Sequence, residues 1–398
     1  MIWEIKIIKE LYLVKGGKRL PKGVLLQSKP NIHPYIRITD MEKGRILNLA
    51  DSFLYVPENV TGAISSYKVK EGDLILSIVG QIGSLNIVGK TLDGANLTEN
   101  CVKLIPISNG ISNDFVYYYL KSEEGQDKID QRAVGSTQPK LPIYNIQTLD
   151  IPLPNFSEQK AIASVLSSLD DKIDLLHRQN KTLEAMAETL FRQGFIEDES
   201  LDEVAVNELI AFNPKRTLAK GAEAIYLEMA GLSTQSFNAT GYYTREFTSG
   251  TKFLNQDTLL ARITPCLENG KAGYVTFLDG NEVGWGSTEY IVMRPKTGFH
   301  PLMAYVLCRN QDFKDYAESC MEGSSGRQRV NVDHLQEFTI GKPSDEVIQQ
   351  FNEYIQSIES KLIYNSRQIK TLEKLRDTLL PKLMSGEVRV QYQTDEVL

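Results

Sequence analysis

Two halves of the chain carry the same pattern, and this internal duplication limits the possible fold more than any other feature. The tetrapeptide KTLE stands at 181–184 and again at 370–373, an offset of 370 − 181 = 189. The run GDLILSIVG at 72–80 parallels QDTLLARIT at 256–264, an offset of 256 − 72 = 184, and KRLPKG at 18–23 parallels KRTLAKG at 215–221. Offsets near 190 residues are too long for a solenoid repeat, so they indicate one domain-plus-helix unit used twice.

Each copy begins with about 150 residues of mixed character. Short β-branched runs such as LILSIV at 74–79 and EYIVM at 289–293 are separated by Gly, Pro and Asn, which predicts short strands joined by turns. One short helix is expected in each copy, at 115–122 and at 301–309. The fold class is therefore α+β, with two homologous mixed α/β domains, an internal pseudo-twofold duplication and two long helices that separate the domains.

The first long helix is expected over 157–194, with Ser157 as its N-cap. Its seam positions alternate in steps of four and three, a period of 3.5 that is typical of a coiled coil. These positions are Ile162, Leu166, Leu169, Ile173, Leu176, Asn180, Leu183 and Leu190, with Ala187 between the last two.

The second long helix is expected over 344–390 and repeats this pattern. Its seam positions are Ile355, Ile358, Leu362, Asn365, Ile369, Leu372 and Leu379, interrupted by Arg376. So narrow and long an apolar stripe favours antiparallel pairing of the two helices, while the alternative is that each helix packs on its own domain. The predicted division is 1–156 and 195–343 for the domains, 157–194 and 344–390 for the helices, and 391–398 for a C-terminal tail.

The net charge of 44 − 51 = −7 over 398 residues argues against a protein that coats nucleic acid through uniform basicity. The sequence contains no phosphate loop, HExxH or GxSxG motif, and its four histidines and four cysteines are scattered. We therefore expect no catalytic residue and no metal ligand. No apolar run has the length of a membrane helix, so we expect a cytoplasmic protein without membrane contact.

Basic residues nevertheless gather locally. Residues 1–50 contain ten Lys and Arg against four Asp and Glu, a balance of 10 − 4 = +6. Two pairs of loops, matched across the duplication, mix cations with Gly, Gln and hydroxyl side chains, the residue types that bond phosphates and read base edges. The candidate DNA-binding residues are Lys15, Lys18, Arg19 and Lys22, then Gln138 and Lys140, then Lys215, Arg216 and Lys220, and finally Arg327, Gln328 and Arg329 of the loop 323–329.

Taken together, these segments resemble the specificity subunits of type I restriction-modification systems. In the first half the resemblance rests on GKRLPKG (17–23), LDGANLTEN (92–100), GSTQPKLP (135–142) and IPLPNFSEQK (151–160). In the second half it rests on FNPKR (212–216), ARITPCLENGK (261–271), GSTEYIVMRP (286–295) and GSSGRQRV (323–330).

The resemblance implies two target-recognition domains, each reading one half of a bipartite site in double-stranded DNA. It implies that the antiparallel helices dock two methyltransferase subunits, which carry S-adenosylmethionine and methylate adenine. Two further subunits, which are ATP-driven motors and nucleases, complete such complexes, so this chain is expected to hold no cofactor itself. The alternatives are an assembly adaptor without sequence-selective DNA binding and, third, an enzyme that acts alone.

Overall fold

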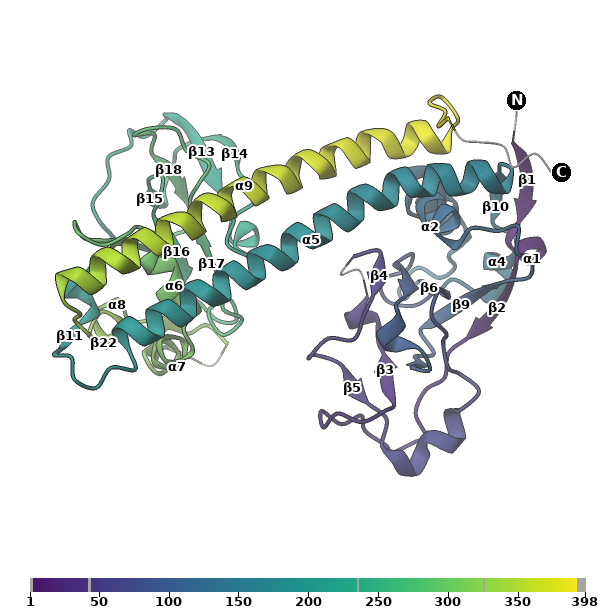
Figure 1. Ribbon diagram of the computed structural model, residues 1–398, viewed down its shortest axis with the longest axis horizontal. Helices are drawn as coiled ribbons and strands as arrows, with labels where there is room; N and C mark the ends of the chain where they lie inside the picture. Colours follow the sequence, from purple (N-terminus) through teal and green to yellow (C-terminus); the bar gives the residue numbers. More distant parts are fainter. Residues whose placement is uncertain (1–2, 42–43, 235, 325, 392–398) are drawn as a thin grey trace. The chain divides into compact units, whose positions relative to one another are not determined.

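The computed structural model describes residues 3–41, 44–234, 236–324 and 326–391 (Figure 1). The chain divides into two compact units. The first unit comprises residues 1–174 and 371–398, and the second comprises residues 175–370. Each unit therefore contains a mixed α/β region together with part of each long helix. Ser325 and residues 392–398 of the predicted C-terminal tail lie outside the described residues.

The first unit is built on a five-stranded sheet in the order β2-β9-β6-β7-β4, beside a three-stranded sheet β5-β3-β8 and a pair β1-β10. The strands are β1 (Glu4–Ile7), β2 (Tyr12–Gly16), β3 (Pro34–Ile36), β4 (Ile46–Leu47), β5 (Leu54–Tyr55), β6 (Leu74–Ser77), β7 (Leu85–Val88), β8 (Asn96–Leu97), β9 (Cys101–Pro106) and β10 (Asp150–Leu153). The short helices are α1 (Ile8–Leu11), α2 (Asn113–Lys121), α3 (Glu123–Arg132) and α4 (Ile143–Gln147). The apolar face of α2 lies in the same core as β6 and β9.

The second unit repeats this plan with a four-stranded sheet β12-β19-β16-β17 and a second sheet β14-β13-β18-β15, beside the pairs β11-β22 and β20-β21. The strands are β11 (Glu203–Ala205), β12 (Ile210–Phe212), β13 (Glu223–Leu227), β14 (Tyr243–Glu246), β15 (Thr251–Phe253), β16 (Thr258–Ala261), β17 (Ala272–Tyr274), β18 (Gly284–Gly286), β19 (Tyr290–Pro295), β20 (Met321–Glu322), β21 (Arg329–Val330) and β22 (Thr339–Gly341). The short helices are α6 (Met303–Arg309), α7 (Gln311–Ser319) and α8 (Val332–Leu335).

Individual hydrogen bonds repeat between the units. In the first unit the amide of Leu141 donates to the carbonyl of Ile78 at 2.9 Å, and in the second the amide of Val330 donates to that of Arg262 at 2.8 Å. Both carbonyls follow the central strands β6 and β16, which pair antiparallel with β9 and β19. The predicted duplication of a mixed α/β domain is therefore confirmed at the level of backbone pairing.

The long helices are α5 (Phe156–Phe195) and α9 (Asp345–Met384). The predicted N-cap Ser157 is wrong, because the cap is Asn155, whose Oδ1 accepts from the amide of Glu158 at 2.9 Å. Serine and asparagine are both good caps, so the sequence leaves the choice between neighbours open.

The two helices pack antiparallel within each unit. In the first unit Ile162 and Leu166 share a core with Leu383, and Asp170 bonds Arg376. Higher numbers on α5 thus meet lower numbers on α9.

The same direction holds in the second unit. There Asn180 bonds Asn365, and Phe195 packs on Phe351 with ring centroids 5.0 Å apart. The predicted antiparallel arrangement is confirmed.

Candidate nucleic-acid interface

In the first unit, the loop that follows β2 is fixed against the turn between β8 and β9. The amide of Gly17 donates to the carbonyl of Cys101 at 2.9 Å, and that of Lys18 donates to the carbonyl of Leu97 at 2.9 Å. A Cβ on Gly17 would lie 2.0 Å from the carbonyl oxygen of Thr98, so only glycine allows this approach. The loop therefore leaves the sheet along a defined path.

The four candidate cations of this segment differ in their surroundings. Lys15 and Lys22 are exposed, and the Lys18 ammonium lies 5.7 Å from the centre of the Tyr67 ring. Arg19 is 79% exposed, yet its Nε donates to Glu99 Oε1 at 2.6 Å. The hydrogen bond and charge of Glu99 raise the pKa of Arg19. Partial burial by itself raises the pKa of Glu99, but the hydrogen bonds from Arg19 and the backbone outweigh it and leave this pKa below its ordinary value.

The second candidate loop of the first unit, 134–140, is closed by its own backbone. Val134 and Lys140 exchange two hydrogen bonds of 2.8 and 2.9 Å, and Lys140 also forms a bridge with Val79. Gly135 takes a φ of +97°, which favours glycine. Gln138 and Lys140 are exposed at this loop, where they are free to meet a ligand.

In the second unit, the loop after β12 resembles the loop after β2. The amide of Asn213 donates to the carbonyl of Val292 at 2.7 Å, and its Oδ1 accepts from the amide of Val292 at 2.9 Å. Lys215 and Lys220 are exposed. The side chain of Arg216 is only 17% exposed, and its Nη2 lies 3.6 Å from Asp257 Oδ1. Arg216 is thus much less accessible than its lysine neighbours.

Arg216 lines a cavity of about 260 Å³ together with Lys252 and Arg262. The Nε atoms of Arg216 and Arg262 are buried and make no hydrogen bond within the described part of the chain. Lys252 and Arg262 are cations that the sequence reasoning missed. The available signal was that Arg262 lies within the segment ARITPCLENGK (261–271), which carries part of the family resemblance.

The loop 323–329 is attached to the turn after β16. The amide of Gln328 donates to Thr264 Oγ1 at 3.1 Å, and the amide of Thr264 donates to the carbonyl of Gln328 at 3.1 Å. Arg327 is exposed. Arg329 is 47% exposed and donates to both carboxylate oxygens of Glu289, at 2.8 to 3.0 Å, so its pKa is raised by this hydrogen bonding. Glu99 and Glu289 were also missed, because nothing local in the sequence links them to an arginine.

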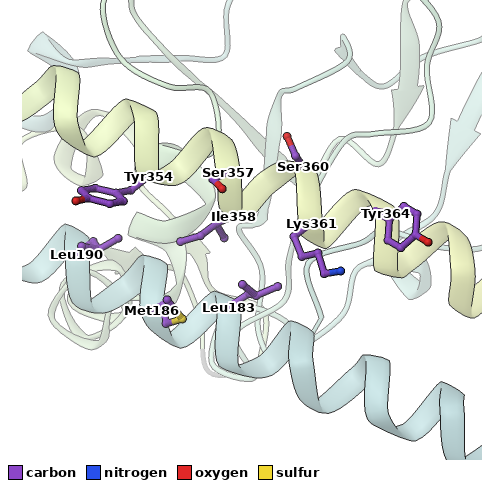
Figure 2. A pocket seen from close by; sticks show the side chains of 9 residues that line it. All are labelled: Leu183, Met186, Leu190, Tyr354, Ser357, Ile358, Ser360, Lys361 and Tyr364. Carbon is purple, nitrogen blue, oxygen red and sulfur yellow. The ribbon is translucent and has the colours of Figure 1, made fainter.

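The helix pair carries a second candidate surface, a groove of about 700 Å³ in the second unit (Figure 2). Figure 2 shows that its lining comes from both helices, with Leu183, Met186 and Leu190 on α5 and Tyr354, Ser357, Ile358, Ser360, Lys361 and Tyr364 on α9. Met186, Tyr354 and Tyr364 are exposed. Exposed tyrosine and methionine in a groove are typical of protein-binding surfaces.

The predicted seam residues differ in depth. Most are buried: Ile162, Leu166, Ile173, Leu176, Ile355, Ile358, Leu362, Asn365 and Ile369. The remainder are half-buried: Leu169, Asn180, Leu183, Leu190, Leu372 and Leu379.

Among the residues that the structure describes, no cluster of three or more His, Cys, Asp and Glu is placed to hold a metal ion. In the same part of the chain, no helix combines the length and the apolar character needed to cross a membrane.

Comparison with known proteins agrees with this architecture. Residues 2–185 match the family model of the type I restriction modification DNA specificity domain. The chain is 22% identical to the type I restriction enzyme MjaIX specificity subunit of Methanocaldococcus jannaschii, over 98% of this chain and 94% of that protein. It is also 22% identical to the HindI specificity subunit of Haemophilus influenzae, over 90% of this chain and 96% of that protein.

Among solved structures, the S subunit of a type I restriction-modification system from M. genitalium has a similar fold. The TM-score is 0.56 at 18% identity, and the match covers 98% of this chain and 97% of that one.

Proposed function

The chain belongs to the family of type I restriction-modification DNA specificity proteins, and from this membership we propose that it reads a bipartite target in double-stranded DNA and docks methyltransferase subunits. Each unit reads one half of the target. The methyltransferase subunits supply S-adenosylmethionine and methylate adenine, and restriction subunits supply ATP-driven translocation and cleavage. The chain itself takes no part in the chemistry and works in the cytoplasm.

One observation carries the DNA-reading proposal: in each unit a loop with exposed lysines follows the corresponding edge strand, β2 in the first unit and β12 in the second. The loop after β2 exposes Lys18, and the loop after β12 exposes Lys215. Exposed cations on a fixed backbone are suited to phosphate contacts, which set the position of a protein on a duplex. A chain with a net charge of −7 must concentrate such contacts, and here they lie at the same edge twice.

The test is binding of the reconstituted complex with methyltransferase subunits to a library of randomised duplexes. We expect recovery of one motif with two specified halves and an unspecified gap. Changing either half should abolish the complex at moderate salt. Equal binding to unrelated duplexes would refute the proposal and leave the adaptor alternative.

Phosphate contacts are tested by salt dependence. Lys18→Ala and Lys215→Ala should each weaken binding to every duplex and reduce the salt slope by about 1. Lys172→Ala, at an exposed position of α5, is the control and should change neither quantity. A slope unchanged in the first two variants would show that these lysines do not neutralise phosphates.

The methyltransferase subunit is proposed to dock on the helix-pair groove. Tyr354 on one side and Met186 on the other offer exposed apolar surface to a partner. Tyr354→Asp should therefore prevent co-purification of the methyltransferase subunit, whereas Glu353→Ala, at the adjacent exposed position, should not. Normal co-purification of Tyr354→Asp would exclude this groove.

A further inference from the structure

Each unit holds an arginine that is hydrogen-bonded to a glutamate beside its candidate DNA-binding loops. These recognition loops are the loop after β2 and the loop 134–140 in the first unit, and the loop after β12 and the loop 323–329 in the second. In the first unit Glu99 lies two residues before β9, and in the second Glu289 lies immediately before β19. The two strands correspond, because β9 pairs with β6 as β19 pairs with β16. The two glutamates are nevertheless offset by one residue. In the first unit the amide of Ile78 donates to the carbonyl of Asn100, the residue after Glu99, whereas in the second unit the corresponding amide of Arg262 donates to the carbonyl of Glu289 itself.

The two arginines come from different loops. Arg19 follows β2, whereas Arg329 begins β21. Ile263 forms an isolated β-bridge with Arg329 in the second unit, and Val79 forms the corresponding bridge with Lys140 in the first. Lys140 therefore occupies in the first unit the position that Arg329 occupies in the second. The glutamate-held arginine is thus present in both units, although it is delivered by different segments.

A carboxylate is an unfavourable neighbour for a polyanion. On a surface that only bound phosphates, Glu99 and Glu289 would weaken binding by repulsion. Their effect on the arginine is to fix a long side chain before DNA arrives, so that less conformational entropy is lost on contact.

The hydrogen bonds leave donors available for a base. Within the described residues, Glu99 accepts only from the Nε–H of Arg19, so both terminal nitrogens of Arg19 remain available. Glu289 takes Nε and Nη2 of Arg329, and this leaves Nη1 together with the second hydrogen of Nη2. Two adjacent N–H donors match O6 and N7 of guanine in the major groove.

We propose that Glu99 and Glu289 are positioning residues that hold Arg19 and Arg329 for reading a guanine edge, one in each half of the target. This inference rests on the proposed function and deepens it, because it separates base-reading arginines from the phosphate-binding lysines beside them.

The experiment repeats the randomised-duplex selection with single variants of the complex. Arg329→Lys and Glu289→Gln should lose discrimination at one and the same base pair of one half-site, by roughly tenfold or more. Arg19→Lys and Glu99→Gln should do so in the other half-site. Because the Gln variants remove a negative charge, their affinity for non-cognate duplexes should stay equal or rise.

A matched control is available in the second unit. Glu197 also holds an arginine, Arg192, but this pair lies at the C-terminal end of α5 and belongs to neither candidate DNA-binding loop. Glu197→Gln should recover the wild-type motif. Thermal unfolding of each variant checks folding, and the Lys variants, which keep the positive charge, test the inference if a Gln variant is unfolded.

Three outcomes distinguish the inference from its premise. If the wild-type complex recovers no motif, the proposed function fails. If the wild type recovers a motif and all four variants recover the same one, the positioning inference alone is overturned. A uniform loss of affinity at every position would make the arginines phosphate contacts and would also overturn it.

Discussion

Asp170 connects a buried tyrosine to the opposite helix, and its replacement by alanine is expected to destabilise the first unit strongly. Tyr118 on α2 donates its hydroxyl to Asp170 Oδ2 at 2.6 Å, and Arg376 on α9 donates Nη1 to Asp170 Oδ1 at 2.9 Å. The side chains of Asp170 and Arg376 are 14% and 28% exposed. Burial, together with the charge and hydrogen bond of Asp170, raises the pKa of Tyr118, so its hydroxyl remains protonated as a donor.

The magnitude follows from these contacts. A hydrogen bond to a charged acceptor contributes about 1.5–3 kcal/mol, and a buried donor left without a partner costs about 1–3 kcal/mol. These contributions are not additive, and the partial exposure of Arg376 reduces its share. We therefore expect Asp170→Ala to lower the free energy of unfolding of the first unit by about 2–4 kcal/mol.

Tryptophan fluorescence can isolate this unit. The chain has two tryptophans. Trp3 packs edge-on against Phe115 in the first unit with ring centroids 6.1 Å apart, and Trp285 is buried in the second unit. In a Trp285→Phe background, urea unfolding followed by fluorescence reports on Trp3. Lys172→Ala, an exposed change on α5, serves as the control.

The same assay can refute the reasoning. A loss below about 1 kcal/mol for Asp170→Ala would show that the polar bridge adds little to helix packing. Adding Tyr118→Phe to Asp170→Ala should recover part of the loss, because it removes the unpaired hydroxyl. No recovery would mean that the penalty has another source.

Three further changes test other parts of the molecule. Gly17→Ala should destabilise the loop after β2 by about 1–3 kcal/mol and weaken DNA binding, because the added Cβ would lie 2.0 Å from a carbonyl oxygen. Gly62→Ala is the control, since its Cβ would enter open space, and equal effects of the two changes would contradict this reasoning. Partial burial by itself raises the pKa of Asp150, but the hydrogen bond and charge of Lys128, together with the charge of Arg132, outweigh it and lower this pKa. The stabilisation that Asp150 provides is therefore present above the unfolded pKa near 4 and is lost as pH falls through the folded value. Asp150→Asn should therefore destabilise more at pH 7 than at pH 3 in urea titrations, and an equal cost at both pH values would contradict the assignment. Replacing Asn180 and Asn365 together by Leu should raise the unfolding free energy of the second unit by about 1–3 kcal/mol, since it removes the buried Oδ1 of Asn365, which has no hydrogen-bond partner among the described residues. The unfolding free energy is measured by Trp285 fluorescence, and a decrease would show that the added side-chain volume does not fit.

Much of the fold could be predicted because its signals are local or periodic. The seam alternation around Ile173 and Leu362 specifies helices with one narrow apolar stripe, and the structure contains both. The duplication identifies two units of the same kind. The N-cap at Asn155 was missed, because a cap depends on where the chain turns and neighbouring polar residues compete for the role.

The candidate site was less accessible to sequence reasoning. The irregular seam residue Arg376 finds its partner Asp170 across 206 residues, and Arg19 finds Glu99 across 80. No local pattern encodes such pairs, since they form only after the sheet and helices are assembled. The cations Lys252 and Arg262 were missed for the same reason.

The sequence by itself determined that one α/β unit is used twice, that each copy ends in a long helix, and that basic residues gather in a chain of negative total charge. Only the tertiary structure decided which of those basic side chains are exposed to solvent and which are paired with a carboxylate. Lys22 and Lys215 project into solvent, while Arg216 is mostly buried beside Asp257, and Arg329 is held by Glu289. The physical reason is that helix and strand periodicity act over a few residues, whereas an ion pair depends on the distance between two groups that the chain brings together from far apart.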